Sequence, residues 1–252
     1  MGAHYTTGLV SVSFRRHGIR EIANAACRAE LTCIEWGSDI HAPCDDNARL
    51  KEIAALQESC GIRCCSYGTY FRLGQTPLAK LPAYIEAAHI LGTNVLRLWC
   101  GDTCGDGMTD DERAALIDTC RRAAVLAEQS GVILCTECHR GTFTERPADT
   151  VALMQAVDSP AFRTYWQPFQ WLSPAENAAV ARQLAPYTEH VHVFQWSGTE
   201  RFSLEEGADD WRSYLAALPA PRTLLLEFMP DDRIASLPRE AAALHAIAGG
   251  LL

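Results

Sequence analysis

Six polar side chains stand out because each lies at the C-terminal end of a short apolar run, where a parallel strand would end. They are Glu35, Arg97, Glu137, Gln167, His192 and Glu227. A charged side chain inside a protein is costly unless it is paired or binds a metal ion. The carboxylates, imidazole and amide oxygen of Glu137, Gln167, His192 and Glu227 could surround one divalent cation. An oxygen-rich set with one imidazole favours Mn, Mg or Co, and zinc remains a candidate.

The segments that carry these residues alternate between short apolar runs and longer stretches of helical periodicity. Strands are predicted near 8–14, 31–36, 61–67, 94–99, 131–137, 162–167, 189–194 and 222–228. Helices are predicted near 18–30, 45–60, 77–91, 109–130, 146–157, 173–185, 208–218 and 236–248. Thr109 and Ser173 are candidate N-caps, and Gly61 is a candidate helix end.

About eight strand–helix units in 252 residues, with no linker-like stretch between them, predict an α/β fold with a single (β/α)8 TIM barrel domain over residues 1–252. A doubly wound open sheet is the alternative. It would normally place a Gly-rich phosphate loop after the first strand, and no such loop follows Phe14.

Alternation along the predicted strands assigns the polar side chains to the barrel interior. His192 lies between two valines, and Glu227 lies between a leucine and a phenylalanine. The same alternation places Glu35 and Arg97 opposite their apolar neighbours, and it places Glu137 on the inner face with Ile133 and Cys135. Because the C-terminal strand ends of a barrel surround one mouth, we expect these side chains to converge there.

Composition excludes several classes of function. The net charge of -9 and the lack of a basic patch argue against a nucleic-acid partner. The chain shows neither an apolar run of about 18 to 20 residues nor a signal-peptide pattern, which predicts a cytoplasmic protein without a membrane partner. The 11 cysteines are scattered, as expected of reduced thiols. The only lysines, Lys51 and Lys80, fall in predicted helices, so a Schiff-base mechanism is not expected.

Six stretches in a fixed order carry a family resemblance. They are Cys33-Ile34-Glu35-Trp36, Ser66-Tyr67-Gly68, Leu96-Arg97-Leu98-Trp99, Thr136-Glu137-Cys138-His139, His190-Val191-His192-Val193 and Leu226-Glu227-Phe228. In these stretches the chain resembles the xylose isomerase-like TIM barrel superfamily of sugar phosphate isomerases and epimerases. The resemblance implies a metal ion held by Glu, Asp, His and Glu on the last four strands, which correspond here to Glu137, Gln167, His192 and Glu227. Gln167 replaces the usual Asp and brings no charge, so we expect weaker metal binding.

The resemblance implies a metal-dependent isomerase or epimerase of a small keto sugar or related hydroxy-carbonyl compound. The reaction would pass through an enediolate, with Glu137 and Glu227 as the catalytic acid and base. The partner would be a small sugar-like molecule, and a homo-oligomer stays open. Further candidates for substrate contact are Glu35, His41, Tyr67, Arg97, Trp99, His139 and Trp196, with Tyr70 and Phe194 as additional aromatic residues.

Three other functions remain as alternatives. A metal-assisted dehydratase of a sugar or cyclitol would use the same ligands and expel a hydroxyl group from the enolate. Phosphodiester cleavage would need more metal ligands and a basic groove, which the sequence lacks. A catalytically decayed ligand-binding barrel is suggested by Gln167 alone.

Overall fold

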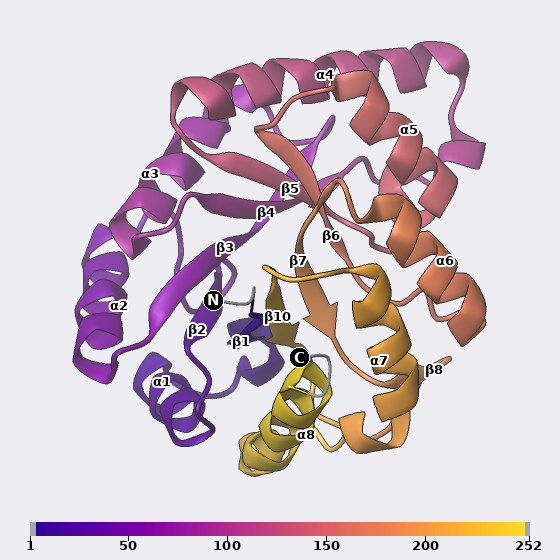
Figure 1. Ribbon diagram of the computed structural model, residues 1–252. Coiled ribbons are helices and arrows are strands. Elements are labelled where there is room, and N and C mark those ends of the chain that lie inside the picture. The colour runs from indigo at the N-terminus through magenta and orange to yellow at the C-terminus, as the bar shows by residue number, and fades with distance from the viewer. Residues whose placement is uncertain (1–3, 250–252) are drawn as a thin grey trace.

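The chain forms a closed barrel of eight parallel strands in the computed structural model, which describes residues 4–249 (Figure 1). The strands follow one another around the barrel in chain order and β10 pairs with β1. They are β1 (Thr6–Val10), β2 (Cys33–Gly37), β3 (Arg63–Leu73), β4 (Val95–Cys100), β5 (Ile133–Glu137), β6 (Phe162–Trp166), β7 (Thr188–Val193) and β10 (Thr223–Leu226). The predicted (β/α)8 fold is confirmed.

Helices between the strands form a ring around the barrel (Figure 1). They are α1 (Ile19–Arg28), α2 (Asn47–Cys60), α3 (Leu81–Leu91), α4 (Asp110–Gln129), α5 (Pro147–Val157), α6 (Pro174–Leu184), α7 (Ala208–Ala217) and α8 (Leu237–Gly249). Thr109 and Ser173 each form a capping box with the glutamate three residues later, and Gly61 ends α2 in the left-handed conformation. In residues 4–249 no helix combines the length and apolar character that crossing a membrane requires.

Two hydrophobic layers support the site. A large layer fills the space between the strands and the helices. A smaller cluster fills the barrel interior with Val10, Val12, Cys33, Cys65, Val95, Cys135, Tyr165 and Leu225. Five polar residues lie on the same inward face, each two positions after a residue of this cluster. They are Glu35 after Cys33, Arg97 after Val95, Glu137 after Cys135, Gln167 after Tyr165 and Glu227 after Leu225. The polar site therefore rests on a packed apolar base. All 11 cysteines are free thiols.

Three local features differ from the sequence predictions. Strand β1 ends at Val10, and Ser11–Phe14 forms a 3-10 helix instead of continuing the strand. Strand β3 continues to Leu73. A short hairpin, β8 (Trp196–Ser197) with β9 (Glu200–Arg201), follows β7. These segments lie on the C-terminal side of the strands, where loops rather than barrel geometry determine the local backbone.

The register of β3 is irregular beside the site. Its pairing with β4 shifts between Gly68 and Arg72. A Cβ atom at Gly68 would lie 2.6 Å from Glu35 Oε1 and 3.0 Å from Arg97 Nη2. Gly68 is therefore required for the close approach of the β3 backbone to this ion pair.

Candidate metal centre

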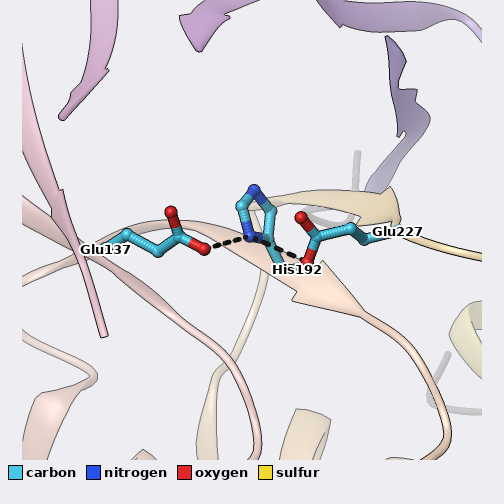
Figure 2. Close-up of side chains that lie close together, drawn as sticks. All are labelled: Glu137, His192 and Glu227. Carbon is cyan, nitrogen blue, oxygen red and sulfur yellow. Dashed lines mark ion pairs between the residues drawn. The ribbon is translucent and has the colours of Figure 1, made fainter. Parts of the chain in front are cut away.

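Glu137, His192 and Glu227 come together at the ends of β5, β7 and β10. Figure 2 shows the two carboxylates on either side of the imidazole. His192 Nδ1 lies 3.5 Å from Glu137 Oε1 and 3.4 Å from Glu227 Oε2. All three residues are buried, and potential ligand atoms of the three lie within 4.8 Å of one another. The parity of the three strands accounts for this convergence, because each side chain is the last inward-facing one of its strand.

Gln167, just after β6, joins this group through its carbonyl oxygen. Its Nε2 donates a hydrogen bond to the Cys138 carbonyl oxygen at 2.8 Å. A carbonyl oxygen requires a donor, so the amide nitrogen is fixed there and Oε1 turns toward His192 Nδ1, 3.2 Å away. The structure thus brings the four predicted metal ligands together.

The net charge of the group depends on whether His192 and Glu227 hold protons. Arg97 bridges two carboxylates: its Nε lies 3.0 Å from Glu35 Oε1 and its Nη1 lies 2.8 Å from Glu137 Oε2. Three buried carboxylates, those of Glu35, Glu137 and Glu227, face this single guanidinium. Without protons on His192 and Glu227 the group carries two excess negative charges, which one divalent cation bound in place of those protons would neutralise.

The donor set also fits a cation better than a proton. Three oxygen atoms, from Glu137, Gln167 and Glu227, converge on Nδ1 of His192. A proton on Nδ1 can make one strong hydrogen bond, whereas a cation can bind the nitrogen and all three oxygens. The residues present therefore fit a divalent metal ion.

The carboxylates and the imidazole differ in their electrostatic environments. Burial raises the pKa of Glu137, but the Arg97 guanidinium and His192 outweigh burial and hold it well below its usual range. Burial raises the pKa of Glu227 to about 7, and the charge of Glu137 adds to this shift. Burial lowers the pKa of His192, but the Glu227, Glu137 and Glu35 carboxylates outweigh it and raise the pKa to about 10. Glu137 is thus ionised, whereas Glu227 titrates near neutral pH.

A cavity of about 440 Å³ opens above these side chains, and Glu137, Gln167 and Glu227 form part of its wall. Six of the residues predicted to contact substrate also line it: Tyr70, Arg97, Trp99, His139, Phe194 and Trp196. Trp99 Nε1 donates to Glu137 Oε2 at 2.7 Å, and its ring stacks on His139 at a centroid distance of 4.5 Å. Trp99 therefore orients a carboxylate and presents an aromatic surface to the cavity.

The structure places Glu35, His41 and Tyr67 outside the cavity wall. Glu35 is fully buried and accepts a hydrogen bond from Ser66 Oγ at 2.7 Å in addition to its ion pair. His41 is held by a serine hydroxyl and a backbone carbonyl. Tyr67 lies in the layer between barrel and helices, and its hydroxyl donates to the Ala42 carbonyl at 2.6 Å. Their contacts are with the protein framework, because Tyr67 faces away from the barrel interior and His41 turns inward from its loop.

Several cavity residues were not predicted from the sequence. They are Val12, Arg15, Cys138, Arg140, Pro168, Phe169, Gln170, Trp171 and Phe228. Phe228 adopts a left-handed backbone conformation with φ 54° directly after Glu227. Such a conformation in a non-glycine residue is strained and is frequent at functional sites. In the sequence, the position of Phe228 directly after Glu227 could have indicated that it lines the site. The sequence carries no comparable indication for the cavity residues that lie in loops.

Residues 23–248 match the xylose isomerase-like TIM barrel family. The chain belongs to this family. No curated protein sequence matches the chain.

Solved structures of the xylose isomerase-like barrel include proteins of different chemistry. A probable 3-DHS dehydratase, AsbF from Bacillus anthracis, is 18% identical with a TM-score of 0.79, covering 95% of this chain and 98% of that chain. D-psicose 3-epimerase from Clostridium cellulolyticum H10 is 15% identical with a TM-score of 0.74, covering 98% and 99%. The IolI protein, whose structure holds a zinc atom, is 12% identical with a TM-score of 0.77, covering 98% and 99%. At these identities the likeness establishes the fold.

Proposed function

We propose that this xylose isomerase-like barrel is a divalent-metal-dependent epimerase or isomerase of a small keto sugar or related hydroxy-carbonyl compound. The observation that supports this most is the pair of carboxylates, Glu137 and Glu227, on two sides of one cation-binding point.

Four atoms would hold the metal ion: Glu137 Oε1, Gln167 Oε1, His192 Nδ1 and Glu227 Oε2. Mn, Mg and Co suit this set, and zinc is compatible with it. When bound, such an ion supplies Lewis acidity that polarises a substrate carbonyl and makes the neighbouring C–H more acidic.

The protein's own groups would move the proton. Glu137 is held in the ionised form that a base needs, and its Oε2 is oriented by Arg97 and Trp99. Glu227 would return a proton to the substrate through Oε1, the carboxylate oxygen that is not assigned to the metal ion. Since the two carboxylates come from well-separated strands, removal on one face and return on the other would invert one stereocentre. The aromatic side chains of the cavity would exclude water and contact the C–H face of a sugar.

Deuterium exchange tests this proposal. We expect the metal-loaded protein to incorporate deuterium from D2O at the carbon next to the carbonyl of a ketose, and we expect Glu137→Gln and Glu227→Gln each to slow exchange by about 10² to 10⁴. Glu86→Gln, the same change at an exposed position of α3, is the matched control and should exchange normally.

Three results would count against this assignment. Undiminished exchange in either variant would exclude that residue from proton transfer. A product one water lighter than its substrate would identify the dehydratase reaction, which the same residues could support. Failure of the metal-loaded protein to exchange any ketose of a broad panel would favour the decayed barrel.

The proposal also assigns the enzyme to the cytoplasm, where its 11 free thiols would stay reduced. Its ligand would be a small sugar-like molecule rather than a nucleic acid, since the net charge of -9 repels phosphate backbones.

A further inference from the structure

Trp171 is an exposed tryptophan at the mouth of the cavity. It lies in the loop between β6 and α6 and is 54% exposed. Among residues 4–249 only two other large hydrophobic side chains, Ile40 and Val125, are comparably exposed. The ring packs edge-to-face on Phe169 at a centroid distance of 5.4 Å, and both rings line the cavity. A large apolar surface left in water at a ligand cavity is a candidate binding surface.

The loop that carries Trp171 is firmly anchored. Asn177, only 3% exposed, accepts a hydrogen bond from the Phe169 backbone N–H at 2.8 Å. Its amide nitrogen donates to the carbonyl oxygens of Phe169 at 3.0 Å and Leu172 at 3.2 Å. These three bonds fix the backbone on both sides of Trp171. The fold therefore holds this ring outward by its backbone, without burying it.

Trp171 lines two hollows at once. One is the cavity above the metal ligands, and the other is an open groove of about 460 Å³ between the first turn of α5 and α6. Gln167, a metal ligand, lies four residues before Trp171 on the same loop. A bound small molecule that touches Gln167 and extends outward along the β6–α6 loop passes over the Trp171 ring.

The size of the cavity exceeds that of a single sugar ring. A hexose at the packing density of organic crystals occupies roughly 200 Å³, whereas the cavity measures about 440 Å³. The reacting ring must lie at the base, beside Glu137 and Glu227. The outer part of the cavity, bounded by Phe169 and Trp171, is then available to another group of the same molecule.

We propose that Phe169 and Trp171 form an outer subsite for a second ring, joined to the reacting ring by a glycosidic bond. This inference rests on the proposed function and narrows its substrate class to glycosides. The flat C–H face of a pyranose, or an aryl ring, would stack on the exposed indole. Gln170, beside these rings in the cavity wall, offers an amide to the hydroxyl groups of a sugar.

Calorimetric binding of non-reactive glycosides tests the subsite. The probes are methyl β-D-glucopyranoside with one ring, methyl β-cellobioside and methyl α-maltoside with two sugar rings, and phenyl β-D-glucopyranoside with an aryl ring. In protein purified without chelator, we expect at least one two-ring probe to bind roughly three- to tenfold more tightly than the one-ring probe. Trp171→Ala should abolish this preference. Val125→Ala, at an equally exposed apolar position on α4, should retain it.

The arms of the experiment separate the possible results. Tighter binding of only the phenyl glucoside would identify the second ring as aryl, and tighter binding of a disaccharide would identify it as a sugar. The inference is overturned if no two-ring probe binds more tightly than the one-ring probe, or if Trp171→Ala keeps the preference. It is also overturned if Trp171→Ala only dissociates an oligomer, which would assign the ring to a contact between copies.

This result is independent of the chemistry at the base of the cavity, because none of the probes carries a ketone. If the wild-type protein shows no preference for two-ring probes but exchanges deuterium normally, only the proposal of the outer subsite is rejected. If the protein prefers two-ring probes but exchanges deuterium with no ketone substrate, only the proposed reaction is rejected.

Discussion

Metal binding to this protein should release protons, because a cation at the candidate centre competes with protons on two of its ligands. Although burial lowers the pKa of His192, the surrounding carboxylates raise it to about 10. Burial and the charge of Glu137 raise the pKa of Glu227 to about 7. Nδ1 of His192 and Oε2 of Glu227 lie 3.4 Å apart and face the same point. A cation bound there requires both groups to be unprotonated.

The number of protons released follows from these two pKa values. Near pH 6, His192 is protonated and Glu227 is about nine-tenths protonated, so nearly two protons must leave. Near pH 8, about one proton leaves from His192 and about a tenth from Glu227. The apparent association constant should therefore rise about 1000-fold from pH 6 to pH 8. His192 accounts for about 100-fold of this rise and Glu227 for about tenfold.

Titration calorimetry of metal-stripped protein with Mn, in buffers of different ionisation enthalpy, measures this proton release. We expect Glu227→Gln to release about one proton at both pH values, because only His192 then exchanges its proton for the metal. Release of less than about one proton by the wild-type protein near pH 6, or equal release at both pH values, would contradict this prediction.

Further substitutions test the ligand set and the framework. Gln167→Glu keeps the side-chain length and adds a charge, so it should bind Mn more tightly than the wild-type protein. Gln167→Met removes the oxygen and should bind Mn more weakly. Equal Mn affinities of both variants and the wild-type protein in calorimetry would mean that residue 167 is not a ligand. Arg97→Gln leaves Glu35 buried without its partner and should lower the free energy of unfolding of the metal-free protein by about 3 to 5 kcal/mol, measured by urea denaturation; a loss below about 1 kcal/mol would contradict the role assigned to this ion pair. Thr109→Ala removes the capping box of α4 and should cost about 1 kcal/mol in the same assay, whereas unchanged stability would mean that the cap does not contribute.

The barrel and the convergence of the strand-end polar side chains were predictable from the sequence because both depend on strand periodicity. Side chains alternate across a strand, so the residue types around His192 and Glu227 reveal which face is inward. A closed parallel barrel then fixes where the strand ends meet. Those two constraints need no knowledge of loops, and they placed Glu137 and Gln167 beside His192 and Glu227.

The rest of the site depends on features without periodicity. The shift in register beside Gly68 lets β3 approach the ion pair, and nothing in the alternation of β3 indicates it. Loop residues such as Trp171 and Arg15 follow no repeat, so their direction is set by tertiary hydrogen bonds like those of Asn177. His41 also lies in a loop, and its inward orientation depends on a serine hydroxyl from another segment.

Anomalous diffraction from crystals of the Mn-loaded protein tests the central claim most directly. We predict one strong manganese peak per chain, bounded by Glu137, Gln167, His192 and Glu227. A crystal with no peak at this point, or with its manganese bound elsewhere while Glu137 stays paired with Arg97, would contradict the proposed metal centre and the function built on it.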